Sequence, residues 1–304
     1  MLAKTHSPRG LTVLELLVTM SSVGIVFAVV LPAMGVARES SRRVACSNKL
    51  RELGLALHCH HNAKSCLPTG WQWEPSGTTA YGWAVPLLPY IGQPDLRDAI
   101  NLKLPVGDPR NRVSRETLLA QMMCPSDIVE PSFMLLEDDE NLIDETPRTS
   151  KAWGTLRADR IALLRLPSSN YVGVHGTVEP ADIESSRGQH PTLADGTFPG
   201  DVKIQFRDFQ RGLARTFVVG ERTMAQASST WYGVDRRGED SLARLVGSAL
   251  EGINQTYGEE CDFSSRHPGG AHFLHGDGHV AFVTEQMEPR LYRKHARLRP
   301  DGRD

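Results

Sequence analysis

The sequence lacks the short motifs that mark common nucleotide-binding, metalloprotease and serine-hydrolase sites. It contains no P-loop, no GxGxxG, no HExxH and no GxSxG pattern. Its five cysteines form no CxxC pair, which disfavours a zinc ribbon or a thioredoxin-type redox site. The net charge of -2 provides no long-range attraction for nucleic acid. The sequence therefore indicates neither a familiar enzyme class nor a nucleic-acid partner.

Scattered polar residues do not replace a missing catalytic motif. Ser168, Ser169, His175 and Asp195 can be grouped on paper as nucleophile, base and acid, and Cys124 is a potential thiol nucleophile. Residues of these types in predicted strands more often serve packing and turns, and Cys124 has no partner motif nearby. We expect no enzymatic activity and no cofactor.

What the sequence does contain is one long hydrophobic run near its N-terminus. From Leu11 to Ala37 the only charged side chain is Glu15, and these 27 residues exceed the roughly 20 that cross a bilayer as a helix. No small-x-small cleavage site follows a short apolar core, as it would in a secretory signal. The run by itself predicts an uncleaved membrane anchor.

The residues around Gly10 indicate a more specific role. The stretch "RGLTVLELLV" resembles the cleavage signal of type IV pilins and type II secretion pseudopilins, although that family prefers Phe where this chain has Leu11. The resemblance implies that a prepilin peptidase cuts between Gly10 and Leu11, that the new Leu11 amine is methylated, and that Glu15 serves assembly. Because an ionised carboxylate in hydrocarbon needs a partner, Glu15 would neutralise the Leu11 amine of its own or a neighbouring subunit. The simpler reading is a carboxylate that snorkels or protonates.

Two signals disagree about orientation. The flank after the run carries Arg38, Arg42 and Arg43 and is more basic than the one before it, which by the positive-inside rule places the body in the cytoplasm. The pilin resemblance implies that the body lies outside the cytoplasmic membrane. We follow the resemblance because a peptidase signal is more specific than a count of charges. The partners it implies are prepilin peptidase, other pilin-like subunits and the membrane, with no nucleic acid.

The helical pattern continues beyond the apolar run. Apolar residues recur at spacings near 3.6 at Val44, Leu50, Leu53 and Leu57. We expect one helix from residue 11 to about residue 62, apolar all round in its first half and amphipathic in its second.

Later segments have strand character. They are "NYVGVHG", "VKIQFRDF", "ARTFVVGER", "STWYGVD" and "AHFLHGDGHVAFVTE", and their Gly, Pro and Asp breaks predict an antiparallel sheet. The last contains Asp277-Gly278 between alternating apolar residues, which predicts a hairpin with a type I′ turn. We also expect a short helix in "RETLLAQMMCPSD" and a solvated basic tail in "EPRLYRKHARLRPDGRD".

Several motifs, in this order, resemble the bacterial family of domain of unknown function 1559, whose members carry a prepilin-type start. The motifs are "CSNKLRELGLALHCHHNAKSCLPTG", "CPSD", "SNYVGVHG", "FVVGERT" and "SRHPGGAHFLHGDGHVAF". The family's C-terminal mark, a His, nine residues and Asp-Gly, corresponds to His267, Asp277 and Gly278. Because Cys46 and Cys124 fall in the CSN and CPSD motifs, the resemblance implies a disulfide between them. A Cys59–Cys66 pair or reduced buried cysteines are the alternatives.

Two histidine clusters have ligand-like spacing. One is His58, His60 and His61 beside Cys59 and Cys66, and the other is His267, His272, His275 and His279 around the hairpin. A polar helix end explains the first, and turn chemistry with backbone hydrogen bonds explains the second. We expect no metal site.

Together these features predict an α+β protein, with a pilin-like N-terminal helix whose membrane-embedded first half precedes a part packed on an antiparallel sheet head. The expected regions are a leader (1–10), a transmembrane helix (11–37), its amphipathic continuation (38–66) and an extracytoplasmic head (67–304) with a loop-rich insertion around 125–165. The expected function is that of a pseudopilin-like structural subunit of a type II secretion or type IV pilus-like system, in the cytoplasmic membrane or a surface filament. A stand-alone anchored binding module for envelope or glycan ligands is the alternative.

Overall fold

The chain divides into two compact units, Met1–Val44 and Ala45–Asp304. A computed structural model describes residues 12–127, 130–138, 161–180, 194–255 and 258–300. Helix α1 (Val13–Lys64) contributes residues to both units, and Pro32 lies within it without ending it. The predicted single long helix is therefore confirmed, and the α+β class is confirmed by the sheets of the second unit.

In the first unit, the described part of α1 exposes its apolar side chains all round. Val13 is 74% exposed and Val36 73% exposed, at the two ends of the apolar stretch. Among the described residues, α1 is the helix long and apolar enough to cross a membrane, and none of its apolar window is buried. A helix that is apolar on every face suits lipid rather than water. This segment has the length and composition of a single-pass membrane anchor.

In the second unit, the rest of α1 is amphipathic. Its buried stripe recurs every three or four residues and comprises Cys46, Leu50, Leu53, Leu57 and His60, with Gly54 and Ala56 beside it. The predicted periodicity is thus confirmed for the three leucines. It is wrong for Val44, which is 57% exposed; Cys46 begins the stripe instead.

The central sheet of the second unit has five strands, in the order β11-β10-β6-β5-β9. These strands are β5 (Tyr171–Gly176), β6 (Phe217–Glu221), β9 (Val246–Ser248), β10 (Gly270–His275) and β11 (Val280–Thr284). Neighbours pair antiparallel except β5 and β9, which are parallel. The long chain between β5 and β9 permits the crossover that a parallel pair needs, so the sheet is mixed rather than antiparallel as predicted.

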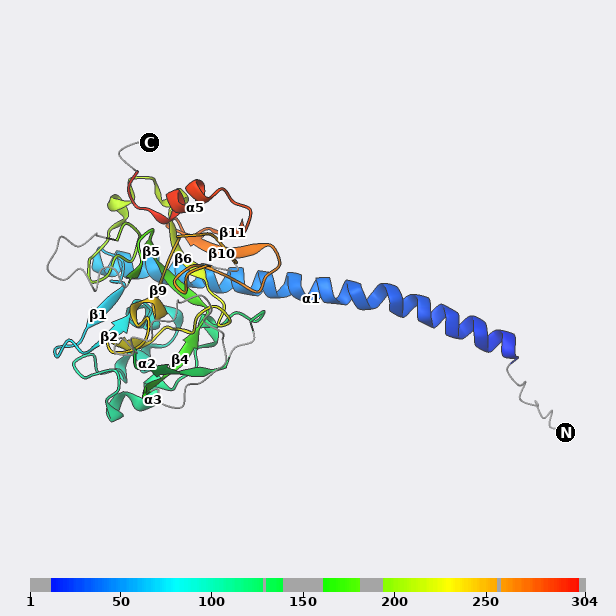
Figure 1. Ribbon diagram of the computed structural model, residues 1–304, viewed down its shortest axis with the longest axis horizontal. Helices are drawn as coiled ribbons and strands as arrows, with labels where there is room; N and C mark the ends of the chain where they lie inside the picture. The colour runs from blue at the N-terminus through cyan, green and yellow to red at the C-terminus, as the bar shows by residue number, and fades with distance from the viewer. Residues whose placement is uncertain (1–11, 128–129, 139–160, 181–193, 256–257, 301–304) are drawn as a thin grey trace, which may run out of the picture. The chain divides into compact units, whose positions relative to one another are not determined.

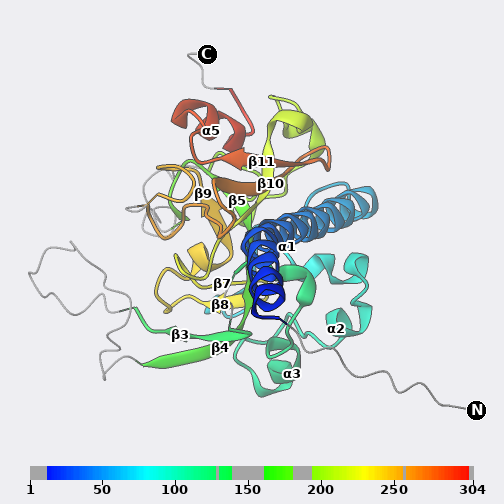
Figure 2. The same ribbon diagram turned by 90° about the vertical axis from the view of Figure 1, so that its right-hand side faces the viewer.

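Two three-stranded antiparallel sheets complete the strands of the described residues. One contains β1 (Trp71–Trp73), β2 (Thr79–Gly82) and β8 (Gly233–Asp235), and the other β3 (Ser132–Leu136), β4 (Ala162–Ser169) and β7 (Ser229–Thr230). Strands β3 and β4, side by side in Figure 2, lie at the two ends of the predicted insertion, and residues 139–160 lie outside the described residues.

Short helical elements occupy the connections. They are η1 (Val85–Ile91), α2 (Pro94–Asp98), η2 (Pro109–Asn111), α3 (Arg112–Arg115), η3 (Ala120–Met122), η4 (Phe206–Asp208), η5 (Leu213–Arg215) and η6 (Leu242–Arg244).

The five-stranded sheet is covered on both faces, because successive side chains of a strand point to opposite sides. On one face, Phe273 and Phe217 stack with ring centroids 4.3 Å apart beneath Tyr292 of α5 (Pro289–Ala296). On the other, Leu274 approaches Gly54 of α1 so closely that a Cβ there would lie 2.8 Å from its Cδ1. Figure 1 shows α5 beside β10 and β11. The predicted solvated tail is therefore wrong for 289–296, since Tyr292 and Ala296 are buried.

Two local predictions are also wrong. The "VKIQFRDF" segment forms η4 instead of a strand, because Asp208 Oδ2 accepts the Gln205 backbone N–H at 2.7 Å and closes a capping box. The expected helix in "RETLLAQMMCPSD" is replaced by α3 and η3. Lys49 Nζ donates to the carbonyl oxygens of Ala120 and Met123 at 2.8 and 2.7 Å, so α1 holds the end of η3 where the expected helix would continue.

Candidate functional site

Five segments far apart in the sequence converge on one buried site in the second unit. Cys46 comes from α1, Cys124 and Asp127 follow η3, Asn170 separates β4 from β5, Glu221 ends β6, and Arg266 and His267 precede β10. Cys46 lies within α1, and the other residues lie in loops or at the end of a strand. All five motifs of the DUF1559 resemblance contribute a residue to this site.

Glu221 is the central charge of the site and is 1% exposed. Its Oε2 accepts the His272 backbone N–H at 2.7 Å and lies 3.1 Å from His272 Nδ1. Its Oε1 accepts no hydrogen bond and lies 3.4 Å from His267 Nε2. Burial alone would raise the pKa of Glu221, but the contacts with His267 and His272 outweigh it and lower that pKa. The carboxylate is thus kept ionised inside the protein.

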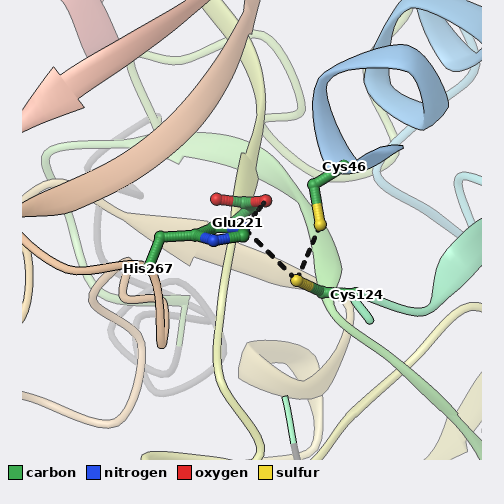
Figure 3. Close-up of side chains that lie close together, drawn as sticks. All are labelled: Cys46, Cys124, Glu221 and His267. Atoms are coloured by element: carbon green, nitrogen blue, oxygen red, sulfur yellow. Dashed lines mark hydrogen bonds and ion pairs between the residues drawn. The ribbon is translucent and has the colours of Figure 1, made fainter. Parts of the chain in front are cut away.

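Cys46 and Cys124 lie beside Glu221 and His267 (Figure 3). Their Sγ atoms are 2.8 Å apart, and Cys124 Sγ is 3.5 Å from His267 Nε2. The hydrogen bond with Cys46, together with burial, raises the pKa of the Cys124 thiol well above its ordinary value. All five cysteines are free thiols here, so the Cys46–Cys124 disulfide stays a prediction, as does a Cys59–Cys66 pair.

Asp127 joins the segments around this cluster. Its carboxylate accepts from Asn170 Nδ2 at 2.7 Å, Thr223 Oγ1 at 2.9 Å, the Met224 backbone N–H at 2.8 Å and Arg266 Nε at 2.9 Å. Asn170 Oδ1 in turn accepts the Cys124 backbone N–H at 2.8 Å. The loop that carries the CPSD motif (residues 124–127, the CPSD loop) is therefore held against β6 and the loop before β10 by charged and amide groups.

A pocket open to solvent reaches the cluster from one side. Its lining includes Cys124, Asp127, Asn170, Glu221, Thr223 and Arg266. Cys124 and Glu221 of the cluster are therefore next to a small space in the protein.

The residues of the C-terminal motif do not meet. His267 lies before β10 and contacts Glu221, whereas Asp277 and Gly278 lie in the turn at the other end of β10. The predicted hairpin of β10 and β11 is confirmed, but its turn is not type I′. Gly278 has φ +90° and Asp277 does not have a positive φ, and His275 O accepts the Gly278 N–H at 3.0 Å. This is the three-residue loop with a glycine bulge.

That turn packs on α1. His58 Nε2 lies 3.0 Å from the Gly276 carbonyl oxygen, and a Cβ on Gly54 would lie 3.4 Å from Gly278 Cα. The Asp-Gly part of the motif therefore serves helix-to-hairpin packing, while His267 belongs to the buried site.

The other histidines are engaged separately. His60 Nδ1 lies 3.0 Å from the Cys66 carbonyl oxygen, and His61 stacks on Phe206 with ring centroids 3.8 Å apart. His275 and His279 stack on each other across the turn, with ring centroids 3.9 Å apart. In the part of the chain that the structure describes, the one group of three or more potential ligands held together is Cys46, Cys124, Glu221 and His267.

Of the residues considered for catalysis, Cys124 belongs to the buried site beside His267, and the other four are tied to backbone or to charges elsewhere. Ser168 Oγ donates to the Glu130 carbonyl oxygen at 2.6 Å, Ser169 Oγ donates to the Tyr171 carbonyl oxygen at 2.9 Å, and His175 Nδ1 lies 2.9 Å from the Phe198 carbonyl oxygen. Asp195 Oδ2 pairs with Arg297 Nε at 2.9 Å. No contact among these four side chains appears in the described residues.

Of the processing and assembly residues, Gly10 and Leu11 lie outside the described residues. Glu15 is exposed in the first unit, and its Oε2 accepts the Thr12 N–H at 2.8 Å and Thr12 Oγ1 at 2.9 Å. Thr12 Oγ1 accepts the Glu15 N–H in return at 3.2 Å, which forms a capping box. The spacing Thr-x-x-Glu was a sequence signal for it.

Sequence reasoning missed the roles of Glu221, Asp127 and Asn170. A charge that ends an apolar strand, as in "FVVGE", is a signal for a buried carboxylate, and such a group needs partners. The partners of this carboxylate could not be predicted from the sequence, because they come from segments that are distant in the chain.

Comparison with known proteins places most of the chain in one family. Residues 36–290 match the family described as protein of unknown function (DUF1559). No curated protein and no solved structure matches the chain. The match includes all residues of the buried site and begins after Glu15.

Proposed function

The chain belongs to the DUF1559 family, and from this premise we propose that it is a membrane-anchored, pseudopilin-like structural subunit of a type II secretion or type IV pilus-like system. In this proposal prepilin peptidase cuts after Gly10, residues 11–37 hold the subunit in the cytoplasmic membrane, and the second unit lies outside the cytoplasm. Its work is assembly with other pilin-like subunits, without enzymatic turnover.

The observation that carries the proposal is the position of Glu15. It is the only charge in the apolar run, and the surrounding side chains of α1 are exposed on every face. A helix of this kind can pack against the same helix of neighbouring subunits within a membrane, and a buried charge then specifies the register.

The capping box between Thr12 and Glu15 supports a specific way in which Glu15 would set the register of neighbouring subunits. Thr12 holds the Glu15 carboxylate through its N–H and its hydroxyl. Cleavage after Gly10 would create a positive amine on Leu11, the residue next to Thr12. Glu15 would then have a local partner in the isolated subunit and could exchange it for the amine of a neighbouring subunit on assembly.

Processing is tested by the intact mass of the protein extracted from membranes. We expect the mass of a chain that begins at Leu11, with one added methyl group. A mass that still includes residues 1–10 would refute the processing step.

Assembly is tested by replacing the charge. We expect Glu15→Gln to abolish incorporation into filaments or into complexes captured with other pilin-like subunits, while membrane insertion persists. Ser22→Ala is the matched control, because Ser22 lies exposed on the same helix and bonds only the Val18 carbonyl oxygen of its own helix among its described contacts. Equal incorporation of Glu15→Gln and the control would favour an anchored protein that does not polymerise.

A further inference from the structure

Four potential metal ligands meet in the buried site. One donor atom from each of Cys46, Cys124, Glu221 and His267 can be chosen so that all four lie within 4.8 Å of one another, and all four residues are buried. They come from α1, the CPSD loop, β6 and the loop before β10, so this is a meeting point of the tertiary structure and not a local sequence motif.

Two of the contacts in the cluster also have the separations expected between the ligands of one metal ion. Cys124 Sγ to His267 Nε2 is 3.5 Å, and His267 Nε2 to Glu221 Oε1 is 3.4 Å. Metal–ligand distances of about 2.0–2.3 Å in tetrahedral zinc sites separate neighbouring donors by roughly 3.3–3.8 Å. The two cysteine sulfurs, at 2.8 Å, would have to open by about 1 Å, which side-chain rotation can provide.

The second observation is that one buried oxygen of Glu221 has no close hydrogen-bond donor and only the 3.4 Å contact with His267 Nε2. Oε2 is engaged by His272, whereas Oε1 accepts no hydrogen bond although Glu221 is 1% exposed. An ionised oxygen inside a protein requires a positive partner. A ligand carboxylate held in place by a second residue is also the usual arrangement around bound metals, and His272 is placed to do this.

We propose that Cys46, Cys124, Glu221 and His267 bind one divalent transition-metal ion of the zinc class. On binding, the two thiols release their protons to solvent and bind as thiolates, with neutral His267 through Nε2 and Glu221 through Oε1. A Cys46–Cys124 disulfide would explain the two sulfurs alone and would leave Glu221 Oε1 with the 3.4 Å contact to His267, whereas an ion uses all four groups. The ion would enter by local opening beside the small pocket that Cys124 and Glu221 line.

The metal would link the amphipathic part of α1 to the sheet, so binding energy would contribute to the stability of the second unit. This inference does not depend on filament assembly: a protein that binds the ion without polymerising, or polymerises without the ion, would separate the two proposals.

The first test uses the full-length protein extracted in detergent without chelator or reductant. We expect one zinc per chain by elemental mass spectrometry, with Cys46 and Cys124 both alkylated on unfolding without reduction. A Cys46–Cys124 disulfide in this protein would overturn the proposal. So would failure of the reduced, metal-free protein to take up one equivalent of Co²⁺ with the absorption of tetrahedral thiolate coordination.

The second test identifies the ligands. We expect Cys46→Ser, His267→Gln and Glu221→Gln each to weaken zinc binding by at least tenfold, in competition with a chelator of known affinity. Cys261→Ser is the matched control, because Cys261 is also buried but is not part of the cluster. Unchanged zinc affinity in all three ligand variants would overturn the assignment. The cobalt spectrum of the unaltered protein remains decisive if a variant does not fold.

Discussion

His272 binds Glu221 through two groups of the same residue. Its backbone N–H donates to Glu221 Oε2 at 2.7 Å, and its ring Nδ1 lies 3.1 Å from the same oxygen. The contact joins β10 to β6 across the sheet and fixes one carboxylate oxygen, which leaves the other directed at His267 and the cysteines. The buried charge thus links the sheet to the loops and to α1.

Removing the Glu221 carboxylate should destabilise the protein strongly. We expect Glu221→Ala to lower the free energy of unfolding by about 3–5 kcal/mol, because the partners of a buried ion pair are left without compensation. Urea unfolding in detergent and in the presence of a chelator measures this effect without a metal contribution. Glu52→Ala, at an exposed position of α1, should change it by less than about 0.5 kcal/mol. An equal, small effect of both variants would show that Glu221 is not a structural charge.

Asp127→Ala should loosen the CPSD loop. The carboxylate accepts from Asn170, Thr223, Met224 and Arg266, and its loss leaves buried donors unsatisfied. We expect a cost of about 3 kcal/mol in the free energy of unfolding and faster hydrogen exchange at the Met224 amide.

The matched control for Asp127 is Glu116→Ala, which removes a carboxylate that pairs with exposed Arg112 on the surface. This change should cost no more than about 0.5 kcal/mol, as for other surface pairs. A Met224 amide protected equally in both variants would contradict the role given to Asp127.

Substitutions of Gly278 test the backbone geometry of the turn between β10 and β11. At φ +90° any side chain is strained, so Gly278→Ala should destabilise the protein by about 1–2 kcal/mol, whereas Gly278→Asn should cost less because Asn tolerates positive φ. Thermal unfolding of the two variants measures the difference. A nearby atom is not the cause, since the closest neighbour of an added Cβ is His58 at 3.8 Å. Equal melting temperatures would contradict the turn geometry.

Acid should destabilise the second unit through His175. Burial lowers the pKa of this fully buried histidine to about 4, from an ordinary value of 6.5. The folded protein therefore binds fewer protons than the unfolded chain between these values, and stability is complete above about pH 6.5 and lost as the pH falls toward 4. The difference corresponds to about 3 kcal/mol.

Urea unfolding at several pH values between 4 and 7 measures this dependence. His175→Gln should be less stable than the unaltered protein at pH 7 but should show a flatter pH dependence. Gln72→Ala, at an exposed residue of β1 that carries no titrating group, should leave the slope unchanged. A slope that is the same in all three proteins would show that His175 does not titrate as a buried group.

Local patterns predicted the features that depend on neighbouring residues along the chain. The long helix followed from an apolar run and from leucines at helical spacing, and the β10–β11 hairpin followed from Asp-Gly between alternating apolar residues. The errors come from side-chain contacts: Asp208 caps the segment expected to be a strand, and Lys49, from the distant α1, binds carbonyl oxygens of the segment expected to be a helix. In each case a side chain competes with the backbone pattern.

The sequence by itself determined that this protein has an apolar N-terminal helix with one charge, Glu15, and a separate α+β unit, because hydrophobic periodicity acts over a few residues. Only the tertiary structure decided that Cys46, Cys124, Glu221 and His267 lie together. Their proximity follows from the antiparallel β6–β10 pair, the packing of α1 on the sheet and the bonds of Asp127, which join segments far apart in the chain. No spacing of residues within a single segment of the sequence predicts that these four side chains lie close together.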